Sequence, residues 1–459
     1  MALQPLSLSA TAAAWLESLT YETLPPDIAA LTRLRVLDVI GNIIAASRRP
    51  IAHILRHAFA TLSPGPVRVP GLDIRLSPPA AALVSGSLGS ALDFDDTHTA
   101  TILHFSTPTV AAGLAAARET SGRELIAAVA GGGELMCRLG MLTPGEFHKH
   151  GFHATAVLGS VGAAYTSARL LRLPAEGIAN AAAIAAGQAA GLTQSIAEET
   201  SSRLLFAGWA AQLGLTAAQL ARSGMRGPDK IFEGERGLFR THIGRALPPD
   251  ATISTNLGTA WETRNAAFKL FPCGHVLHPF IAAALALVQA EHIRSDEIAT
   301  VECRVPPYAV AMVCEPAEQK QAPADDVGAR ISLQHTVAET LCLGRLDGLS
   351  YSNDALSNPA IRSLARRVSY VADEAFATRE RFVGELIVTM KDGRKHSRKE
   401  PSEGGEGGRP IEPDDIERKF RSNVAGAQLS AEPAAIHRLV AGLEGLDNLD
   451  SLTRLCCPP

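Results

Sequence analysis

The sequence lacks an excess of positive charge, a CxxC cysteine pair and a nucleotide-binding loop. Its 43 Lys and Arg residues are outnumbered by 47 Asp and Glu residues, which gives a formal net charge of −4. Proteins that wrap nucleic acid or lie on anionic membranes carry a strongly basic surface, so this balance argues against both partners. No GxGxxG follows an expected strand and no GxxxxGK[ST] occurs, so nucleotide binding is not indicated either.

The chain also lacks signals for export, disulfide formation and zinc binding. Its N-terminus has neither the basic region nor the long apolar core of a signal peptide. Seven cysteines without CxxC spacing indicate neither a disulfide framework nor a zinc knuckle, and they fit a reducing compartment. The least charged stretch, residues 177–197, consists mostly of Ala and Gly, which transfer weakly into lipid. We therefore expect a cytoplasmic protein with a buried helix there and no membrane span.

From about residue 8 to residue 260 the sequence has the periodicity of helices. Apolar residues recur three or four positions apart, as in Leu34, Leu37, Ile40 and Ile44. Several of these stretches are rich in Ala and Gly, whose small side chains let helix axes approach closely. Thr107 followed by Pro108 fits the start of a helix. This part predicts a large all-helical domain over residues 1–261.

Beyond residue 260 the pattern changes to a mixture of strands and helices. Residues 300–305 alternate apolar and polar side chains, which is typical of a half-buried strand. The DG pair at 392–393 lies between two further strand-like runs and predicts a hairpin. With helices expected at 280–291 and 333–343, residues 262–400 predict a smaller α+β domain. Residues 401–459 are expected to begin with a Gly/Pro-rich loop and to end in helices.

Four strings in this order resemble the MmgE/PrpD family. They are SALDFDDTH…LHFSTP at 90–108, GFHATAVLG at 151–159, KLFPCGHVLHP at 269–279 and IERKFRSN at 416–423. The resemblance implies a mostly α protein, in which the α+β domain forms a lid and the C-terminal segment returns to the helical domain. It further implies a homodimer, a pocket between the domains, and a small polycarboxylate substrate handled without a metal or organic cofactor.

The family's activities include dehydration, decarboxylation and epimerisation of small acids, and all three need similar parts. Each needs groups that move a proton at carbon and cations that hold carboxylates. We expect first a hydro-lyase similar to 2-methylcitrate dehydratase. A carboxy-lyase similar to cis-aconitate decarboxylase, an epimerase of an amino or imino dicarboxylate, and a catalytically inactive dimeric binding protein remain as alternatives.

The resemblance assigns three residues to catalysis. His104 lies just before the expected helix start at Thr107, where a side chain can project into a cleft and the helix dipole favours an anion. His153 matches a second family histidine and also precedes an Ala/Gly-rich helix. Asp93 is expected in the pocket, where it orients or charges a histidine. The alternative for each histidine is a hydrogen-bonded residue in the interior.

Four further residues are expected to bind substrate. Thr97 and Lys269 match family positions that contact a carboxylate, and His278 matches one that lines the pocket or positions the lid helix. Arg203 stands where the family pattern has lysine, and it keeps the charge with bidentate geometry. Phe206 replaces a family histidine and makes that corner apolar, so a smaller or partly apolar acid becomes plausible.

Two other interpretations of these strings are weaker. Asp93, Asp95 and Asp96 are too close in sequence for the spacing of a typical calcium loop, so no metal site is expected. Cys273 follows a proline in the 269–279 string, but a thiol without a lowered pKa is inert, and the sequence gives no reason for one.

Overall fold

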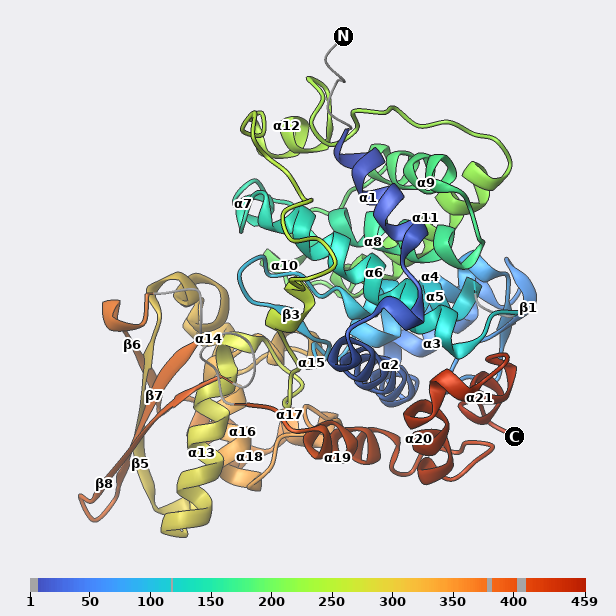
Figure 1. The fold of residues 1–459 in the computed structure, drawn as a ribbon. Coiled ribbons are helices and arrows are strands. Elements are labelled where there is room, and N and C mark those ends of the chain that lie inside the picture. Colours follow the sequence, from blue (N-terminus) through green and yellow to red (C-terminus); the bar gives the residue numbers. More distant parts are fainter. Residues whose placement is uncertain (1–6, 117–118, 378–381, 403–409) are drawn as a thin grey trace.

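The computed structural model describes residues 7–116, 119–377, 382–402 and 410–459, and within them the chain is mostly helical. Figure 1 shows two lobes of unequal size, with a large helical lobe and a smaller lobe that carries a sheet. Their interiors are largely separate, because one apolar core draws on residues 8–266 and 420–456 and the other on residues 273–390, with Val327 of the smaller lobe packed into the first core. The predicted fold class, a large helical domain with a smaller α+β domain, is confirmed.

The large lobe is formed by twelve helices of the described residues and by two pairs of very short strands. The strands β1 (Pro64–Arg68) and β2 (Arg75–Leu76) pair antiparallel, as do β3 (Thr97–His98) and β4 (Ala266–Ala267). The helices are α1 (Leu8–Ser18), α2 (Pro26–Ala46), α3 (Pro50–Phe59), α4 (Pro78–Ser90), α5 (Ser106–Ala116), α6 (Gly122–Met141), α7 (Glu146–Lys149), α8 (Ala154–Leu170), α9 (Ala175–Gly187), α10 (Gln194–Ala197), α11 (Phe206–Arg222) and α12 (Leu238–Ile243).

Small residues bring the central helices of this lobe into close contact. Helix α8 packs against α6, α9 and α11, and α11 also packs against α4. At the α4–α11 crossing, a Cβ on Gly208 would lie 2.0 Å from the Ser87 hydroxyl. Any larger residue at 208 would therefore force the two helices apart, which explains why the Ala- and Gly-rich stretches belong to the core.

The smaller lobe contains a four-stranded sheet covered by helices. Its strand order is β6-β5-β7-β8, with β5 and β6 parallel and the other pairs antiparallel. The strands are β5 (Ile298–Val305), β6 (Val368–Ala372), β7 (Val383–Met390) and β8 (Lys395–Pro401). The helices are α13 (His278–Glu291), α14 (Ala317–Gln321), α15 (Asp326–Ala329), α16 (Leu333–Leu343), α17 (Asn353–Ser357) and α18 (Pro359–Ala365).

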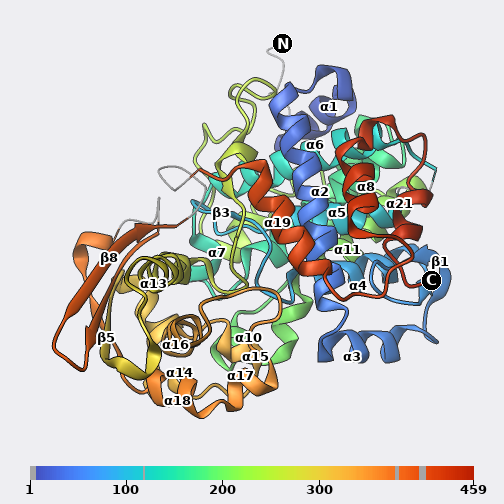
Figure 2. The same cartoon turned by 90° about the horizontal axis from the view of Figure 1, so that it is seen from below.

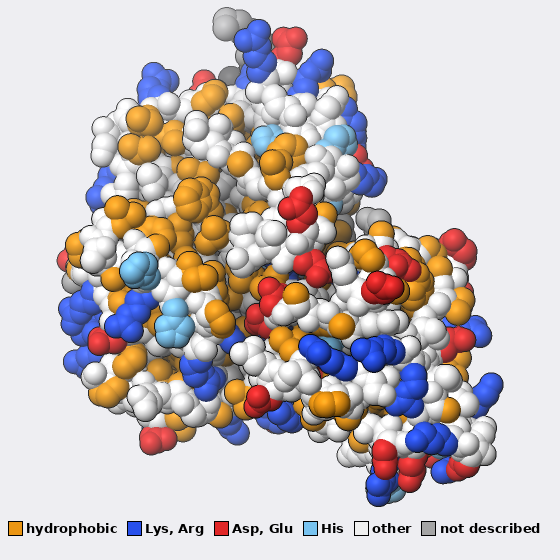
Figure 3. Space-filling view, turned by 180° about the vertical axis from the view of Figure 1, so that it is seen from behind, with side chains coloured by type: hydrophobic (Ala, Val, Ile, Leu, Met, Phe, Trp, Pro, Cys, Tyr) orange, Lys and Arg blue, Asp and Glu red, His pale blue; other side chains and the backbone are white. Residues whose placement is uncertain are grey.

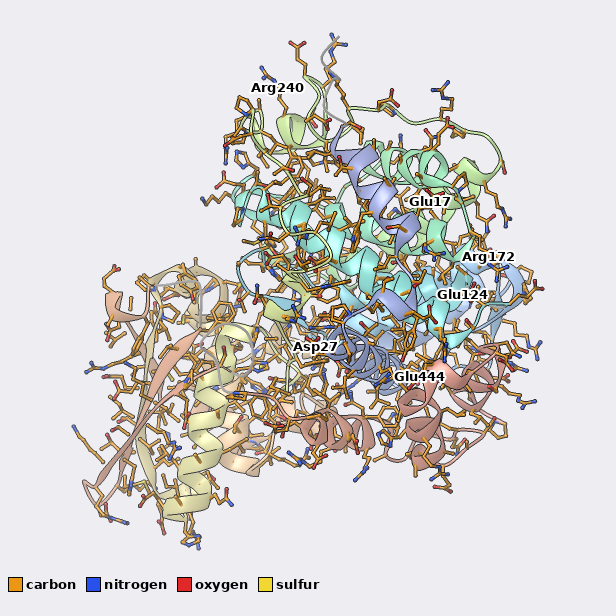
Figure 4. The ribbon with its side chains drawn as sticks, viewed as in Figure 1. Glu17, Asp27, Glu124, Arg172, Arg240 and Glu444 are labelled. Carbon is orange, nitrogen blue, oxygen red and sulfur yellow. The ribbon has the colours of Figure 1, made fainter. Side chains whose placement is uncertain are left out.

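The C-terminal segment returns to the large lobe. Its helices are α19 (Pro413–Val424), α20 (Pro433–Ala441) and α21 (Asp450–Leu455). Figure 2 shows α19 running alongside α2, against which it packs. Arg33 of α2 also pairs with Glu444, labelled in Figure 4, with Nη1 3.2 Å from Oε2. The end of the chain thus covers one side of the helical core.

The structure differs from the sequence predictions in a few details. The predicted hairpin is confirmed as β7 and β8, but the short strands β1, β2 and β3 were not predicted, because two to five residues are too few for a periodic pattern. Helix α5 begins at Ser106 rather than at Thr107, because the Asp96 carboxylate accepts a hydrogen bond from the Ser106 backbone N–H (3.2 Å). Much of the loop expected at 401–415 lies outside the described residues.

One helical stretch passes a simple test for a membrane span. Residues Ser201–Arg222 are long and apolar enough by length and composition, but half of their apolar window is buried inside the protein. Burial of this kind is typical of a core helix. The stretch singled out from the sequence, 177–197, contains α9 instead, whose Ala-rich face is buried against α8 and α11.

Candidate active site

A pocket in the large lobe gathers the residues predicted to be catalytic. It encloses about 400 Å³ of space not filled by atoms, part of it open to solvent. His104, His153 and Asp93 all line it, together with Arg203 and Phe206. These side chains come from parts of the chain up to about 110 residues apart, so their meeting is a property of the fold. The remaining lining residues are Ser90, Asp95, Thr155, Ile196, Leu204 and Ala207.

The two histidines face each other across this pocket. Their ring centroids lie 6.0 Å apart and their planes differ by 11°. On its other side the His153 ring stacks on Phe206, with centroids 4.5 Å apart and planes 18° apart. The three rings therefore form a roughly parallel column in which His153 is the middle member.

One nitrogen of His104 is fixed by the backbone. Its Nδ1 lies 2.6 Å from the carbonyl oxygen of Asp96, which can only accept a hydrogen bond. Nδ1 must therefore carry the proton, and in the neutral ring Nε2 is the basic nitrogen. The backbone N–H of His104 donates to the Thr155 hydroxyl (2.9 Å), which ties this loop to α8. The imidazole is thus oriented and held in one tautomer.

The carboxylate of Asp96 holds the loop that carries His104 in place. Its carboxylate pairs with Arg35 (2.7 Å) and accepts hydrogen bonds from the Ser106 hydroxyl (2.6 Å) and backbone N–H (3.2 Å). Arg35 in turn donates to the carbonyl of Thr263 (2.9 Å). Both members of the pair are almost fully buried, and a buried pair is stable only when further hydrogen bonds complete it, as they do here.

Asp93 lies at the centre of a charge cluster. Its Oδ2 is 3.2 Å from Arg203 Nη1, and its Oδ1 is 3.3 Å from Lys269 Nζ. Burial opposes ionisation of this carboxyl, but the positive charges of Lys269, Arg203 and His104 together hold its pKa well below the usual range. Asp93 is therefore ionised at neutral pH. Of the two predicted roles, orienting or charging a histidine, the contacts of Asp93 fit the second, because its charge acts on His104.

Unlike Asp93, Asp95 and His153 are shifted towards their uncharged forms, because burial disfavours the charged ones. Burial raises the pKa of Asp95, which lines the pocket and accepts a hydrogen bond from the Thr107 hydroxyl (3.2 Å). Burial lowers the pKa of His153 well below its usual value, and His148 and His104 act in the same direction. His153 is thus a neutral imidazole at neutral pH. Asp95 was not among the predicted site residues, so its place in the pocket is new.

Three helices begin at the edge of this pocket. Helix α5 starts two residues after His104, α8 starts directly after His153, and Phe206 is the first residue of α11. Thr155 of α8 and Ala207 of α11 also line the pocket, so first-turn residues of both helices reach it. The N-terminal end of a helix carries partial positive charge and favours anions. The pocket therefore suits a negatively charged guest.

Three residues predicted to bind substrate lie elsewhere. Lys269 is 1% exposed and lies behind Asp93, where Nζ bonds Oδ1 and also donates to the Asp93 carbonyl (3.1 Å). Thr97 belongs to β3, and its hydroxyl is 3.4 Å from His104 Nδ1. His278 is fully buried at the start of α13, with Nε2 3.1 Å from the Phe271 carbonyl. None of them is among the lining residues, and the place of His278 at the start of α13 fits the other role predicted for it, positioning of the lid helix.

The small lobe touches the pocket from one side. Arg203 Nη2 donates to the Val327 carbonyl (2.9 Å) in α15, and Lys320 of α14 pairs with Glu199 (2.6 Å). In the space-filling view from behind, the small lobe lies at the lower right of the helical lobe, with charged side chains on both sides of their junction (Figure 3). The lining residues themselves all belong to the large lobe, whereas the prediction placed the pocket between the domains.

Among the described residues of the pocket, the ionisable side chains do not form a metal-binding cluster. Within the ranges that the structure describes, no group of three or more His, Cys, Asp or Glu side chains has an arrangement that could hold a metal ion. Cys273 is fully buried and is not among the residues that line the pocket. The chemistry available in the pocket is proton transfer by imidazole and carboxyl groups beside a guanidinium.

The lowered pKa of His153 predicts how stability depends on pH. In the unfolded chain a histidine takes up a proton below about pH 6.5, whereas folded His153 stays neutral to a lower pH. The unfolded state then binds more protons, so the free energy of unfolding falls as pH decreases below about 6.5. His153→Asn should flatten this slope in chemical unfolding at pH 5 to 7. His57→Asn, in an exposed position on α3, is the matched control. An unchanged slope in His153→Asn would contradict the assignment of a neutral His153.

Comparison with known proteins gives matches over most of the chain. The profile of the MmgE/PrpD N-terminal domain matches residues 10–249, and that of the MmgE/PrpD C-terminal domain matches residues 271–444. Human cis-aconitate decarboxylase is 29% identical over 405 residues, which cover 84% of this chain and 81% of that protein. A cis-aconitate decarboxylase-like protein of Aspergillus oryzae is 28% identical over 402 residues (83% of each chain). Cis-aconitate decarboxylase of Aspergillus terreus is 25% identical over 484 residues (97% and 95%).

Proposed function

Because the chain belongs to the MmgE/PrpD family, we propose that it is a carboxy-lyase that releases CO2 from a small unsaturated polycarboxylate. The observation that carries this proposal is the pair of imidazoles, 6.0 Å apart, in a pocket that also presents Arg203. The relatives named as cis-aconitate decarboxylases support loss of CO2 over loss of water. The names of these relatives do not support dehydration, which was the first expectation from the sequence.

Binding of the anion rests on Arg203 and on the helix N-termini. The guanidinium offers several donors in one plane, and two of them already contact Asp93 and Val327. A substrate carboxylate placed at the N-terminus of α8 gains from its dipole, whereas α11 continues directly from the 3-10 helix Ser201–Leu205. Together these groups orient the acid with its reacting carbon beside Nε2 of His104.

The bond that breaks joins a CH2 carbon to its carboxylate. In cis-aconitate the neighbouring double bond is conjugated with another carboxyl group, so it can accept the electron pair that CO2 leaves behind. The double bond then shifts so that it ends at the former CH2 carbon. The CH carbon at the other end of the original double bond, which bears a carboxylate, needs one proton. We assign this proton to Nε2 of His104 in its protonated form, because Nδ1 is held by the Asp96 carbonyl. Neutral His153 lies opposite and positions the acid without competing for the proton.

Assays on the purified protein test this function directly. Incubation with cis-aconitate should release CO2 in equal amount to an unsaturated dicarboxylate, measured by a gas electrode and by NMR. With 2-methylcitrate we expect no rise in absorbance from a new conjugated double bond. Water loss from hydroxy acids without CO2 would reinstate the dehydratase. Deuterium uptake into an otherwise unchanged amino or imino dicarboxylate would favour the epimerase.

Replacement of Arg203 should weaken substrate binding more than turnover. Loss of a hydrogen bond to a charged group is worth about 1.5–3 kcal/mol, so Arg203→Met should raise KM by about 10- to 100-fold. Arg203→Lys keeps the charge but loses the planar pair of donors, so its KM should lie between that of the wild type and that of Arg203→Met. Steady-state kinetics measures this, with exposed Arg222→Met at the C-terminal end of α11 as the control. An unchanged KM in Arg203→Met would remove Arg203 from the binding site.

A further inference from the structure

The pocket offers little positive charge for its substrate. Among the lining side chains of the described residues, Arg203 is the one permanent cation. Asp93, which also lines the pocket, is an ionised carboxylate, whereas burial favours the neutral form of Asp95. Arg203 is already in contact with Asp93 through Nη1 and with the Val327 carbonyl through Nη2. A substrate carboxylate must therefore share this guanidinium with a protein carboxylate.

The second nearby cation is also occupied. Lys269 is buried behind Asp93, and its ammonium contacts both Oδ1 and the backbone carbonyl of that residue. Asp93 is ionised, so it balances one of the two cations. What remains is one net positive charge, to which the helix N-termini and a protonated His104 can add. The positive charges of this cluster can balance two carboxylates of a substrate, but they leave a third substrate carboxylate without a partner.

Part of the pocket wall is apolar. It is formed by Ile196, Leu204, Phe206 and Ala207, and the Phe206 ring covers one face of His153 at 4.5 Å. A carboxylate against this wall would lose water and gain no hydrogen bond, which is unfavourable. A methyl or other short alkyl group in the same place would be removed from water against carbon atoms, which is favourable.

We propose that this pocket selects a dicarboxylate with a short apolar substituent in place of a third carboxylate, and that Phe206 is the residue that determines this selectivity. The inference rests on the proposed carboxy-lyase function. It narrows the substrate to acids of the 3-alkylglutaconate type, in which a CH2-carboxylate is attached to a double bond conjugated with the second carboxylate.

The reaction of the methyl member of this class balances. In 3-methylglutaconate the bond from the CH2 carbon to its carboxylate breaks and CO2 leaves. The electron pair of that bond forms the new terminal double bond, and the pair of the former double bond moves to the carbon beside the remaining carboxylate. That carbon takes one proton from His104. The products are CO2 and 3-methylbut-3-enoate, and the consumed proton is replaced from solvent.

The test compares three acids with the wild-type protein. Values of kcat/KM are measured by CO2 release for 3-methylglutaconate, glutaconate and cis-aconitate. We expect 3-methylglutaconate to exceed each of the others by about tenfold or more, since one methyl group in an apolar pocket discriminates by about 10- to 200-fold. A preference for cis-aconitate over 3-methylglutaconate would overturn the inference.

Variants at position 206 test the residue itself. Phe206→His introduces a polar ring and should lower the ratio of 3-methylglutaconate to cis-aconitate by about tenfold or more. Phe206→Leu keeps the wall apolar and should retain the preference. Equal ratios in wild type and Phe206→His would show that Phe206 does not determine selectivity.

Binding of saturated analogues separates this inference from the proposed function. Calorimetry with 3-methylglutarate and with the tricarboxylate tricarballylate measures selectivity without any reaction. Tighter binding of 3-methylglutarate, without CO2 release from any acid, would sustain the selectivity and reject the carboxy-lyase. Tighter binding of tricarballylate, with CO2 released from cis-aconitate, would reject the selectivity and sustain the carboxy-lyase.

Discussion

Replacement of His104 by asparagine is expected to lower kcat by about 100- to 10,000-fold, the usual contribution of a positioned proton donor. The asparagine amide can still donate to the Asp96 carbonyl, as His104 Nδ1 does at 2.6 Å. The variant therefore keeps the anchor of the side chain and loses only Nε2. Its KM and its melting temperature should stay close to those of the wild type.

Single-turnover kinetics on cis-aconitate or on 3-methylglutaconate measures this loss apart from product release. His57→Asn, which removes an exposed histidine of α3, should have wild-type kcat. His153→Asn should lose less than His104→Asn, because neutral His153 positions the substrate and does not supply the proton. If His104→Asn turned over within about threefold of wild type, proton transfer would have to be assigned to another group, and Asp95 is the lining residue with a raised pKa.

The sequence predicted the meeting of His104, His153 and Asp93, and the structure places all three on one pocket. The family resemblance assigned all three, and for His104 and His153 the local sequence also indicated the helix starts beside them, whereas Asp93 lies in the turn after α4. Three such starts, in α5, α8 and α11, converge because Ala- and Gly-rich helices pack closely. Local patterns thus located the parts of the site without giving their mutual distances.

Lys269 and His278 show where the sequence prediction ended. A motif identifies a lysine, but it does not tell whether the ammonium points to the substrate or to a protein carboxylate. Lys269 follows β4, which pairs with β3, and this pairing places its ammonium behind Asp93. His278 begins α13 and faces the Phe271 carbonyl of the preceding turn. Both orientations depend on contacts between distant segments, which a single sequence does not show.

The expectation of dehydration shows a further limit, because the residue types in a site do not identify the reaction. Histidines and a carboxylate-binding cation serve both loss of water and loss of CO2, so these residues do not distinguish the two reactions. The relatives favoured the carboxy-lyase. By contrast, the departure at Phe206 was visible in the sequence, and the structure gives it a physical meaning as part of an apolar wall beside His153.

A buried ion pair that includes Lys419 of the fourth motif string, 416–423, supports the Asp93 loop. Lys419 of α19 lies 2.6 Å from Asp38 of α2 and donates to the Phe94 carbonyl at 2.6 Å. Asn42 also donates to this carbonyl (3.2 Å). Phe94 lies between Asp93 and Asp95, which both line the pocket. The C-terminal segment thus holds the turn that presents two acidic residues, over a sequence separation of 325 residues.

Lys419→Met is expected to lower the free energy of unfolding by about 3–5 kcal/mol, because it leaves the Asp38 carboxylate buried without its partner. Both side chains are at most 3% exposed. Lys149→Met is the matched control, since Lys149 pairs with Glu146 at the surface and such pairs contribute about 0–1 kcal/mol. Chemical unfolding followed by circular dichroism measures the difference.

The loss in Lys419→Met should also depend on pH. Burial raises the pKa of Asp38 to about 6, and Lys419 opposes this rise. Without Lys419 the pKa of Asp38 rises further, so the folded variant binds a proton that the unfolded chain releases above about pH 4. The folded state then binds more protons, and stability falls as pH increases through this range. The deficit relative to wild type should therefore be larger at pH 8 than at pH 5.

The double variant Asp38→Asn/Lys419→Met separates the charge from the packing. It removes the unpaired carboxylate, so it should recover at least about 1 kcal/mol relative to Lys419→Met and lose most of the pH dependence. If Lys419→Met were as stable as Lys149→Met at pH 8, the pair would contribute nothing to stability. In both variants the Phe94 carbonyl still accepts from Asn42, so both should retain part of their activity under conditions in which they are folded.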